Sequence, residues 1–357
     1  MSLNSQKKFL VIKLSALGDI VHALPVARTL RQAYPDAFIA WMIEERYKGL
    51  LHSNPDIDEI IPIRIKSWKK NWNREALKEI LQIIKNLRQQ NFDVVFDLHG
   101  LIKSGVIAML SGARIKSGFH RKNCKEKISS IFFNKKAPYM AGGIHVIDMY
   151  LTLVQSALEI QNLEIQNKVK QFPLPEIQHQ KVEDFFQHHP ELTSKNIIGI
   201  NPGAGFESKL WELERFAQLA DRITVELNCS ILLTWGPGEE HKTKQIAASM
   251  KQKCWVAPPT SIQESIALYK HLTLLVSCDS GPLHLCAALG IPTVSIFGPT
   301  DPVRNGAYGL NHQTVYKMLT CSFCWQKKCP LGTNECMKQV TVDEVFESVR
   351  SNQKSTI

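Results

Sequence analysis

One stretch in the second half of the chain combines a carboxylate with a turn suited to phosphate. An apolar run, Leu272 to Ser277, is followed by Asp279-Ser280-Gly281-Pro282 and then by a second apolar run over 283–289. This order predicts a strand, a turn and a helix that has Pro282 in its first turn. The N-terminus of a helix suits phosphate, and Asp279 can meet a sugar hydroxyl. We therefore predict a nucleotide site here, with a plain connection in a parallel sheet as the alternative.

Asp19 is the candidate for proton transfer in the first half of the chain. An apolar run over 9–14 leads into Ser15-Ala16-Leu17-Gly18-Asp19, which lacks the G-x-G-x-x-G fingerprint of a dinucleotide site. Asp19 is either a helix cap or a general base that removes a proton from an acceptor hydroxyl. The local sequence leaves both interpretations open.

Two further glycine turns follow predicted strands in the second half. The turn Asn201 to Gly205 offers backbone N–H groups to an anion, and Lys209 follows it, where an ammonium could neutralise a diphosphate. Glu239 and Glu240 follow Trp235-Gly236-Pro237-Gly238 and could bind ribose hydroxyls or begin a helix favourably. Together these turns predict a phosphorylated, sugar-bearing ligand.

No catalytic metal is expected, because the chain lacks a His and acid arrangement that would hold zinc at an open site. The pair Asp56 and Asp58 is predicted to be two solvated loop carboxylates. Four cysteines, Cys321, Cys324, Cys329 and Cys336, lie within sixteen residues and could form a structural zinc site. The alternative is four reduced thiols in a surface loop. No other cofactor is expected.

Positive charge is concentrated in the first half of the chain. The net charge is +10, and Arg64 to Arg74 holds five cations and no acid, with Trp68 and Trp72 interleaved. The segment Lys116 to Lys127 adds five cations against one acid. Such segments indicate an anionic partner: nucleic acid, an anionic membrane surface, or a phosphorylated lipid or sugar.

Strands alternating with helices predict parallel sheets, and the pattern restarts after a polar segment, Gln161 to Gln180. We expect two doubly wound α/β domains, residues 1–172 and 173–357, with a cleft between them and a last helix over about 342–353 that packs back on the first domain. The sequence has no apolar run of 18 residues and no secretory signal, so a cytoplasmic protein is expected.

Three motifs resemble those of the ADP-heptose lipopolysaccharide heptosyltransferases. The first is the segment 13–22 (KLSALGDIVH), and the others are 278–284 (CDSGPLH) and 297–302 (FGPTDP). The resemblance runs nearly end to end, and 97–104 (DLHGLIKS) is most similar to heptosyltransferase I. It implies a GT-B fold and an inverting transfer of heptose from ADP-L-glycero-D-manno-heptose that needs no protein-held metal. It also implies a Kdo-lipid A acceptor at the cytoplasmic face of the inner membrane, and no nucleic acid.

The resemblance assigns roles to individual positions. Asp19 corresponds to the catalytic base, and Glu240 to a ribose contact, with Glu239 as the alternative in register. The implied donor-binding residues are Gly203, Ala204, Lys209, Glu240, Asp279, Ser280, Gly281, Pro282 and His284. The implied acceptor-binding residues are Ser15, Gly18, Lys66, Lys69, Lys70, His99 and Lys103.

Two features depart from heptosyltransferase I. The turn Asn201 to Gly205 and the cysteine run over 321–336 look more like heptosyltransferase II, which adds the second heptose. The acceptor therefore stays open between Kdo and a first heptose. A nucleotide-sugar epimerase or hydrolase of the same architecture is a rival within enzymes. A non-catalytic protein that binds anionic membrane or nucleic acid is a rival of another class.

Overall fold

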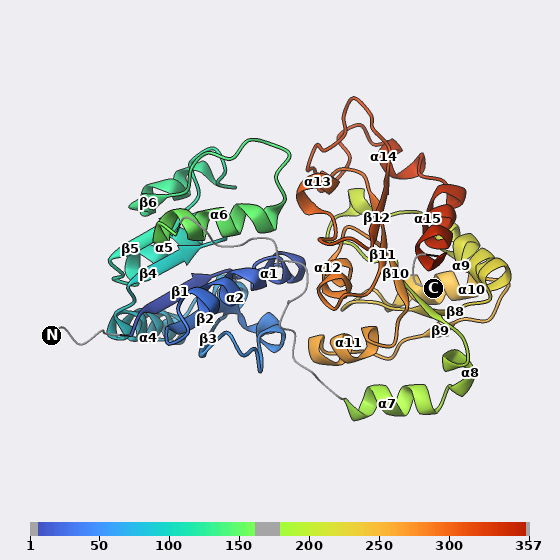
Figure 1. Cartoon of the computed structure of the whole chain (residues 1–357), viewed down its shortest axis with the longest axis horizontal. Coiled ribbons are helices and arrows are strands. Elements are labelled where there is room, and N and C mark those ends of the chain that lie inside the picture. The colour runs from blue at the N-terminus through green and yellow to red at the C-terminus, as the bar shows by residue number, and fades with distance from the viewer. Residues whose placement is uncertain (1–5, 161–178, 355–357) are drawn as a thin grey trace. The chain divides into compact units, whose positions relative to one another are not determined.

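The computed structural model describes residues 6–160 and 179–354 of the chain (Figure 1). Two compact units divide it, Met1–Pro175 and Glu176–Ile357, called unit 1 and unit 2 below. The expected boundary at residues 172 and 173 lies outside the described residues. No helix within the described ranges is long and apolar enough to cross a membrane.

Unit 1 is built on a six-stranded sheet in the order β3-β2-β1-β4-β5-β6. All pairings recorded between its strands are parallel. Ile12, the last residue of β1, is opposite Met42 on one side and Asp97 on the other, so the carboxyl ends of the central strands form one edge. The strands are β1 (Lys8–Ile12), β2 (Phe38–Glu44), β3 (Glu59–Ile63), β4 (Val94–Asp97), β5 (Ile115–Gly118) and β6 (Lys135–Lys136).

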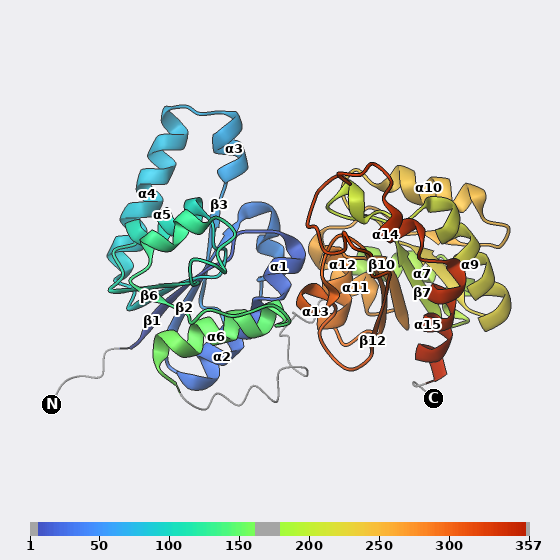
Figure 2. The same ribbon diagram turned by 90° about the horizontal axis from the view of Figure 1, so that it is seen from above.

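Helices cover both faces of this sheet, as its apolar central strands require. On one face α2 (Leu24–Ala33) packs against α6 (Val146–Leu158). On the other α4 (Arg74–Gln90) packs against α5 (Ile102–Leu110) (Figure 2). The short 3-10 helix η2 (Lys127–Phe132) packs on α5, while η1 (Glu45–Leu50) and α3 (Ile65–Lys70) follow the ends of β2 and β3.

The apolar pattern predicts one amphipathic helix over about residues 20–33 after the first strand, but the structure has two helices, α1 (Leu17–Val21) and α2. Pro25 lies in the first turn of α2. Proline has no N–H to donate and its ring clashes with the preceding turn, so it begins a helix and does not continue one. The break leaves Asp19 on a helix of its own, directly after β1.

Unit 2 repeats the architecture with the strand order β12-β11-β10-β7-β8-β9. Its strands also pair in parallel wherever a pairing is recorded. In chain order they are β7 (Ile197–Asn201), β8 (Ser230–Leu233), β9 (Trp255–Val256), β10 (Leu274–Cys278), β11 (Thr293–Phe297) and β12 (His312–Tyr316). β10 and β7 lie at the centre, so the predicted strand before Asp279 is fully buried.

Helices also flank both faces of the sheet in unit 2. On one face α9 (Leu213–Leu227) packs against α10 (Glu240–Ser249) and α15 (Val342–Lys354). On the other α11 (Ile262–Tyr269) packs against α7 (Gln180–Gln187) and α12 (Gly281–Ala288) (Figure 1). The smaller elements are α8 (Pro190–Thr193), η4 (Glu207–Lys209), α13 (Pro302–Asn305) and α14 (Glu335–Lys338).

The last helix differs from expectation in its packing partner. We expected it to pack back on the first domain, but α15 buries Val345, Phe346 and Val349 completely in the core of unit 2. These residues recur at helical spacing and form one apolar stripe, which can bury itself against one partner surface. That surface is α9 and β12.

Candidate functional site

Asp279 follows β10 and is the most heavily bonded carboxylate of the strand-end edge in unit 2. Its side chain is 5% exposed, and its Oδ2 atom accepts hydrogen bonds from Lys209 Nζ at 2.6 Å and Thr300 Oγ1 at 2.6 Å. His284, one turn into α12, lies with Nε2 3.4 Å from Oδ1. Three elements therefore converge on one buried carboxylate.

The electrostatics of this cluster favour the ionised acid. Burial alone raises the pKa of Asp279, but the hydrogen bond from His284 and the charge of Lys209 together hold it well below its usual range. Asp279 is therefore a permanent negative charge at neutral pH, bonded to a lysine that is itself largely buried. The sequence predicted Lys209, Asp279 and His284 at this site, whereas Thr300 lies in the motif over 297–302 but was not singled out as a site residue.

The residues that open α12 stand beside this cluster. Ser280 is the N-cap residue, but its hydroxyl bonds Ser277 Oγ at 2.8 Å and caps no backbone N–H. Gly281 and Pro282 form the first turn, as predicted. The turn therefore keeps its backbone N–H groups, apart from proline, available at the positive end of the helix.

The turn after β7 is shaped around a second carboxylate. Asn201 spans the turn, donating to Thr234 O at 3.1 Å and accepting from Gly203 N at 3.2 Å. A Cβ atom added to Gly203 would lie 2.1 Å from Glu239 Oε2, so only glycine fits there while this carboxylate stays in place. Ala204 is half-buried against the core.

The two adjacent glutamates differ in where their side chains lie. Glu239 is 24% exposed, lies against Gly203 and pairs with Lys242 at 2.9 Å. Glu240 begins α10, is 47% exposed and pairs with Lys244 at 3.0 Å on the same helix. The turns after β7 and β8 therefore lie against Glu239, which the sequence analysis gave as the alternative to Glu240.

Asp19 lies in the first turn of α1, at the carboxyl end of β1. It is half-buried, and its Oδ2 atom accepts a hydrogen bond of 3.1 Å from the backbone N–H of Ala16. A carboxylate has two oxygens and room for several donors, so this bond leaves capacity for an acceptor hydroxyl. Ser15 precedes this turn and Gly18 is buried within it. Asp19 thus makes a local helix-terminus bond and retains the capacity of a base.

A buried lysine behind Asp19 was not singled out from the sequence. Lys13 is 4% exposed and donates to Leu98 O at 2.9 Å and to Tyr150 Oη at 2.7 Å. Burial by itself lowers the pKa of Lys13, but Tyr150, Asp19 and Asp97 outweigh burial and raise it. The signal in the sequence is a lysine at the end of an otherwise apolar strand. Its tyrosine partner is 137 residues away.

Asp97 and His99 follow β4 at the same edge. Burial raises the pKa of Asp97 to about 6, and its Oδ1 atom accepts from His99 N at 2.7 Å and Gly100 N at 3.1 Å. Burial also lowers the pKa of His99 to about 2, helped by Lys13, Lys103 and Lys125. His99 is therefore neutral at physiological pH, so it can offer an acceptor group a hydrogen bond but no positive charge.

The predicted acceptor lysines lie on two elements of unit 1. Lys66, Lys69 and Lys70 belong to α3, where Lys66 and Lys70 are exposed. Lys103 is half-buried in the first turn of α5. Because α3 follows β3 and α5 follows β4, both groups begin at the carboxyl edge where Asp19 lies.

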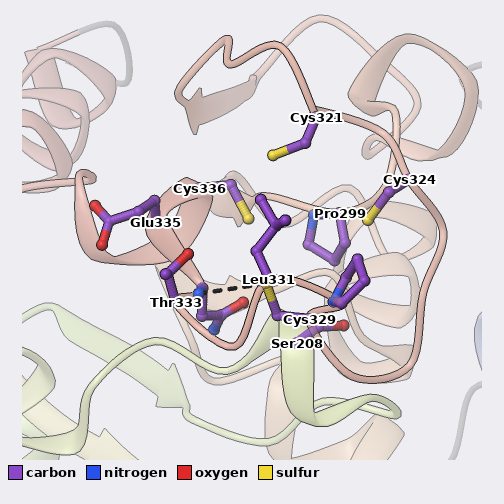
Figure 3. Close-up of a pocket in the computed structure, with 11 residues that line it drawn as sticks. Ser208, Pro299, Cys321, Cys324, Cys329, Leu331, Thr333, Glu335 and Cys336 are labelled. Atoms are coloured by element: carbon purple, nitrogen blue, oxygen red, sulfur yellow. Dashed lines mark hydrogen bonds between the residues drawn. The ribbon is translucent and has the colours of Figure 1, made fainter.

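The four clustered cysteines line one small pocket of unit 2, with Ser208, Pro299 and Leu331 among its other walls (Figure 3). All four thiols are half-buried and free of disulfides. Cys329 Sγ accepts a hydrogen bond of 3.4 Å from Asn334 N. In the described part of the chain no three His, Cys, Asp or Glu side chains are arranged to hold a metal ion, and the structural zinc stays a prediction.

The acidic pair at 56 and 58 makes structural ion pairs, and the predicted solvation holds for the exposed Asp58 but is wrong for the buried Asp56. Asp56 is 1% exposed and pairs with Arg28 at 3.0 Å, while Asp58 bonds Arg31 and Ile39 N, each at 2.7 Å. The sequence could not show this, because both arginines lie on α2, some 27 residues away in the chain. The pair fastens α2 to the sheet.

Comparisons with known proteins agree on one family. The model of glycosyltransferase family 9 (heptosyltransferase) matches residues 80–334. Lipopolysaccharide heptosyltransferase 1 of Pseudomonas aeruginosa is 28% identical over 92% of this chain and 89% of its own length. The protein of the same name from Escherichia coli K12 is 26% identical over 85% of this chain and 92% of its own length.

Solved structures give the same result at the level of fold. The E. coli heptosyltransferase WaaC with ADP superposes with a TM-score of 0.73 at 25% identity, covering 97% of this chain and 99% of the other. A glycosyl transferase family 9 structure from Veillonella parvula reaches 0.82 at 22% identity, covering 99% and 98%. The two parallel-sheet units are thus those of a GT-B protein.

Proposed function

The chain belongs to glycosyltransferase family 9, the heptosyltransferases, and we propose that it transfers heptose from ADP-heptose to the Kdo region of a lipopolysaccharide inner core. The observation that carries this proposal is the buried cluster of Lys209, Asp279, Thr300 and His284 at the carboxyl edge of unit 2. Such an edge is where open α/β sheets bind ligands. WaaC, the solved relative at 25% identity, is described with ADP and with ADP-2-deoxy-2-fluoro heptose.

We assign the donor to unit 2. Lys209 and the N-terminus of α12 supply positive charge for the diphosphate, and Asp279 accepts hydrogen bonds from hydroxyl groups of the donor. We assign the ribose contact to Glu239 in preference to Glu240, because the Glu239 carboxylate lies against the Gly203 turn, although both glutamates pair with a lysine of α10. No protein-held metal is part of this scheme, since lysine and helix dipole provide the charge.

We assign the proton transfer to Asp19 of unit 1. Its carboxylate removes the proton of the acceptor hydroxyl as the oxygen attacks the anomeric carbon of the donor. The new glycosidic bond forms as the bond to ADP breaks, with inversion at that carbon. Lys209 stabilises the departing diphosphate. Asp19 suits this role because its recorded bond to Ala16 leaves its carboxylate able to accept another donor.

We assign the acceptor to the carboxyl edge of unit 1. Lys66, Lys69, Lys70 and Lys103 provide cations for its phosphate and Kdo carboxylate groups, and His99 provides a neutral hydrogen-bonding ring. The lipid moiety of such an acceptor implies work at a membrane surface, and we propose peripheral association with the cytoplasmic face of the inner membrane. Two relatives carry the name lipopolysaccharide heptosyltransferase 1, and this supports the Kdo acceptor that the resemblance to heptosyltransferase I implies.

The second candidate is transfer to a first heptose already in place. The turn Asn201 to Gly205 and the cysteine run over 321–336 support it, because both look more like heptosyltransferase II.

One assay separates these functions. Purified protein is incubated with ADP-heptose and either Kdo-lipid A or the same lipid carrying one heptose, and products are identified by mass. Transfer to Kdo-lipid A supports the first function, and transfer only to the heptosylated lipid supports the second. Free heptose or an epimer formed without acceptor would contradict both.

A further inference from the structure

Exposed apolar side chains gather on one face of unit 1. Every large apolar residue recorded as exposed within the described part of this unit belongs to α3–α5 or to the segment around η2, and none to α2 or α6. They are between 38% and 70% exposed: Trp72, Leu77, Leu81, Ile102, Met109, Ile128, Ile131 and Tyr139. The opposite face of the same sheet therefore has no comparable set.

The elements that carry these residues are joined to one another. The ring of Phe132, at the end of η2, is packed so closely on α5 that a Cβ atom on Gly105 would lie 2.5 Å from it. Glu126 Oε2 accepts a hydrogen bond of 2.7 Å from Ile102 N at the start of α5. α5 in turn packs against α4. We call the exposed side chains of residues 66–85, 102–109 and 121–139 the amphipathic face.

Cations are interleaved with these apolar residues. Lys78 and Lys85 are exposed on α4 beside Leu81, and the segment 121–127 brings four more exposed cations close to Ile128. The face also carries three acids, fewer than these six cations: Glu75, which is exposed, Glu79, which accepts a hydrogen bond from Trp68 Nε1 at 2.9 Å, and Glu126, which is bound to α5. Exposed apolar groups interleaved with lysines are typical of proteins that bind anionic membranes.

The chemistry of the apolar residues separates lipid from nucleic acid. Leu77, Leu81, Ile102, Ile128 and Ile131 are aliphatic, and aliphatic side chains gain free energy by entering the boundary between headgroups and acyl chains. Single-stranded nucleic acid is bound instead by aromatic rings on which bases stack. Trp72 and Tyr139 alone on this face could stack in that way.

We propose that the amphipathic face docks unit 1 on a bilayer that contains anionic lipids. α3 and α5 both begin at the carboxyl edge of the sheet, so docking through this face brings Asp19 and the acceptor lysines close to the headgroups. This inference rests on the membrane association in the proposed function and deepens it by naming the surface that contacts lipid. It can be tested apart from heptose transfer, because adhesion to lipid requires neither donor nor acceptor.

The test is vesicle co-sedimentation of the full chain without substrates. Vesicles of phosphatidylcholine are compared with vesicles that also contain phosphatidylglycerol, at low and high salt. We expect binding only to the anionic vesicles and weaker binding at high salt. Trp72→Ser/Leu81→Ser and Ile128→Ser/Ile131→Ser should each weaken that binding about tenfold or more, because each removes two apolar groups. Lys78→Glu/Lys85→Glu should weaken it as well.

Matched controls come from unit 2. Leu310 is 93% exposed and Val225 is 66% exposed, so Leu310→Ser/Val225→Ser removes as much exposed apolar surface from elsewhere. Lys195→Glu/Lys270→Glu makes the same charge change on exposed lysines of unit 2. These controls should bind vesicles like the wild type, and circular dichroism should give one fold for all variants.

Three results would overturn the proposal: no binding to anionic vesicles, an equal loss in the unit 2 controls, or tighter binding to single-stranded DNA than to vesicles. Failure of heptose transfer with vesicle binding intact would contradict the proposed function alone. If the wild-type protein transfers heptose to a soluble acceptor but does not bind anionic vesicles, docking alone is contradicted.

Discussion

Buried charged groups are paired at the carboxyl edge of the sheet in unit 2 and are not paired with each other at the corresponding edge in unit 1. In unit 2 the cation and the carboxylate bond each other directly, with Lys209 Nζ 2.6 Å from Asp279 Oδ2. In unit 1 the buried Lys13 bonds neutral oxygens of Leu98 and Tyr150, while Asp97 accepts from backbone N–H groups. One edge holds a closed ion pair, and the other keeps its charges apart.

The consequence is seen in the two carboxylates. Burial raises the pKa of both, yet Asp279 stays well below its usual range and Asp97 rises to about 6. A cation at hydrogen-bonding distance outweighs burial, whereas a cation bonded elsewhere does not. Unit 2 therefore keeps a fixed negative charge at neutral pH, whereas the carboxylate of Asp97 in unit 1 exchanges its proton near pH 6.

The largest expected effect concerns the proton. Asp19→Asn keeps the size of the side chain but removes its basicity, so kcat should fall by about 10²–10⁴-fold, the usual range of general-base catalysis. Donor affinity, measured by calorimetry with ADP, should stay close to that of the wild type because ADP is assigned to unit 2. Asp36→Asn, at an exposed loop of unit 1, is the matched control. Near-normal turnover of Asp19→Asn would remove the proposed division between the two edges.

The second effect concerns the closed pair. Lys209→Met leaves Asp279 buried without its ammonium partner and should lower the free energy of unfolding by about 3–5 kcal/mol. It should also weaken ADP binding. Adding Asp279→Asn should recover part of the stability, since the double variant buries no unpaired charge. Denaturant unfolding of the four proteins measures this, and strictly additive losses would show that the pair is not coupled.

The third effect is the pH dependence of stability caused by Asp97. Its folded pKa of about 6 lies above the value for an unfolded chain, so the folded state holds this proton more tightly. The resulting stability is fully present below about pH 4 and is lost as pH rises through about 6. A shift of about two units corresponds to about 3 kcal/mol. Asp97→Asn should remove this loss, as measured by urea unfolding between pH 4 and 8. If Asp97→Asn and the wild type lose the same stability between pH 4 and 8, Asp97 is not the group that causes the loss.

The smallest effect distinguishes two neighbours. Glu239→Gln should weaken ADP binding by about 1–2 kcal/mol, because a charged acceptor for ribose hydroxyls becomes a neutral one. Glu240→Gln should change the affinity little, since Glu239 and not Glu240 is the carboxylate packed against Gly203. Isothermal calorimetry on both variants is sufficient. If Glu240→Gln weakens ADP binding more than Glu239→Gln does, the ribose contact belongs to Glu240.

Much of the fold could be predicted from the spacing of apolar residues and from the turn residues between them. Buried β-branched runs followed by polar turns predicted the central strands of both units, and the strand before Asp279 is β10. The break between α1 and α2 was missed although Pro25 signals it, because the apolar pattern continues across the break. The packing of α15 on α9 and β12 was also not predicted, because an apolar stripe on a helix does not show which surface covers it.

For the candidate sites, too, local sequence identified some residues, and the structure was needed to show their contacts. Lys209, Asp279 and His284 were identified from local motifs, and they do lie together. Thr300 belongs to the motif over 297–302, but its bond to Asp279 was not predicted, because that contact spans 21 residues. Glu239 and Glu240 are adjacent in the chain, and only the backbone at the start of α10 decides which of them meets Gly203.

The sequence by itself determined the parallel-sheet units, the turns that end their strands and the residue types placed at those turns. These are local properties of periodicity, capping and turn chemistry. Only the tertiary structure decided which charges became partners: Lys209 with Asp279 across 70 residues, and Lys13 with Tyr150 across 137. Protonation depends on distances of a few ångströms between groups far apart in the chain, and no local pattern encodes them.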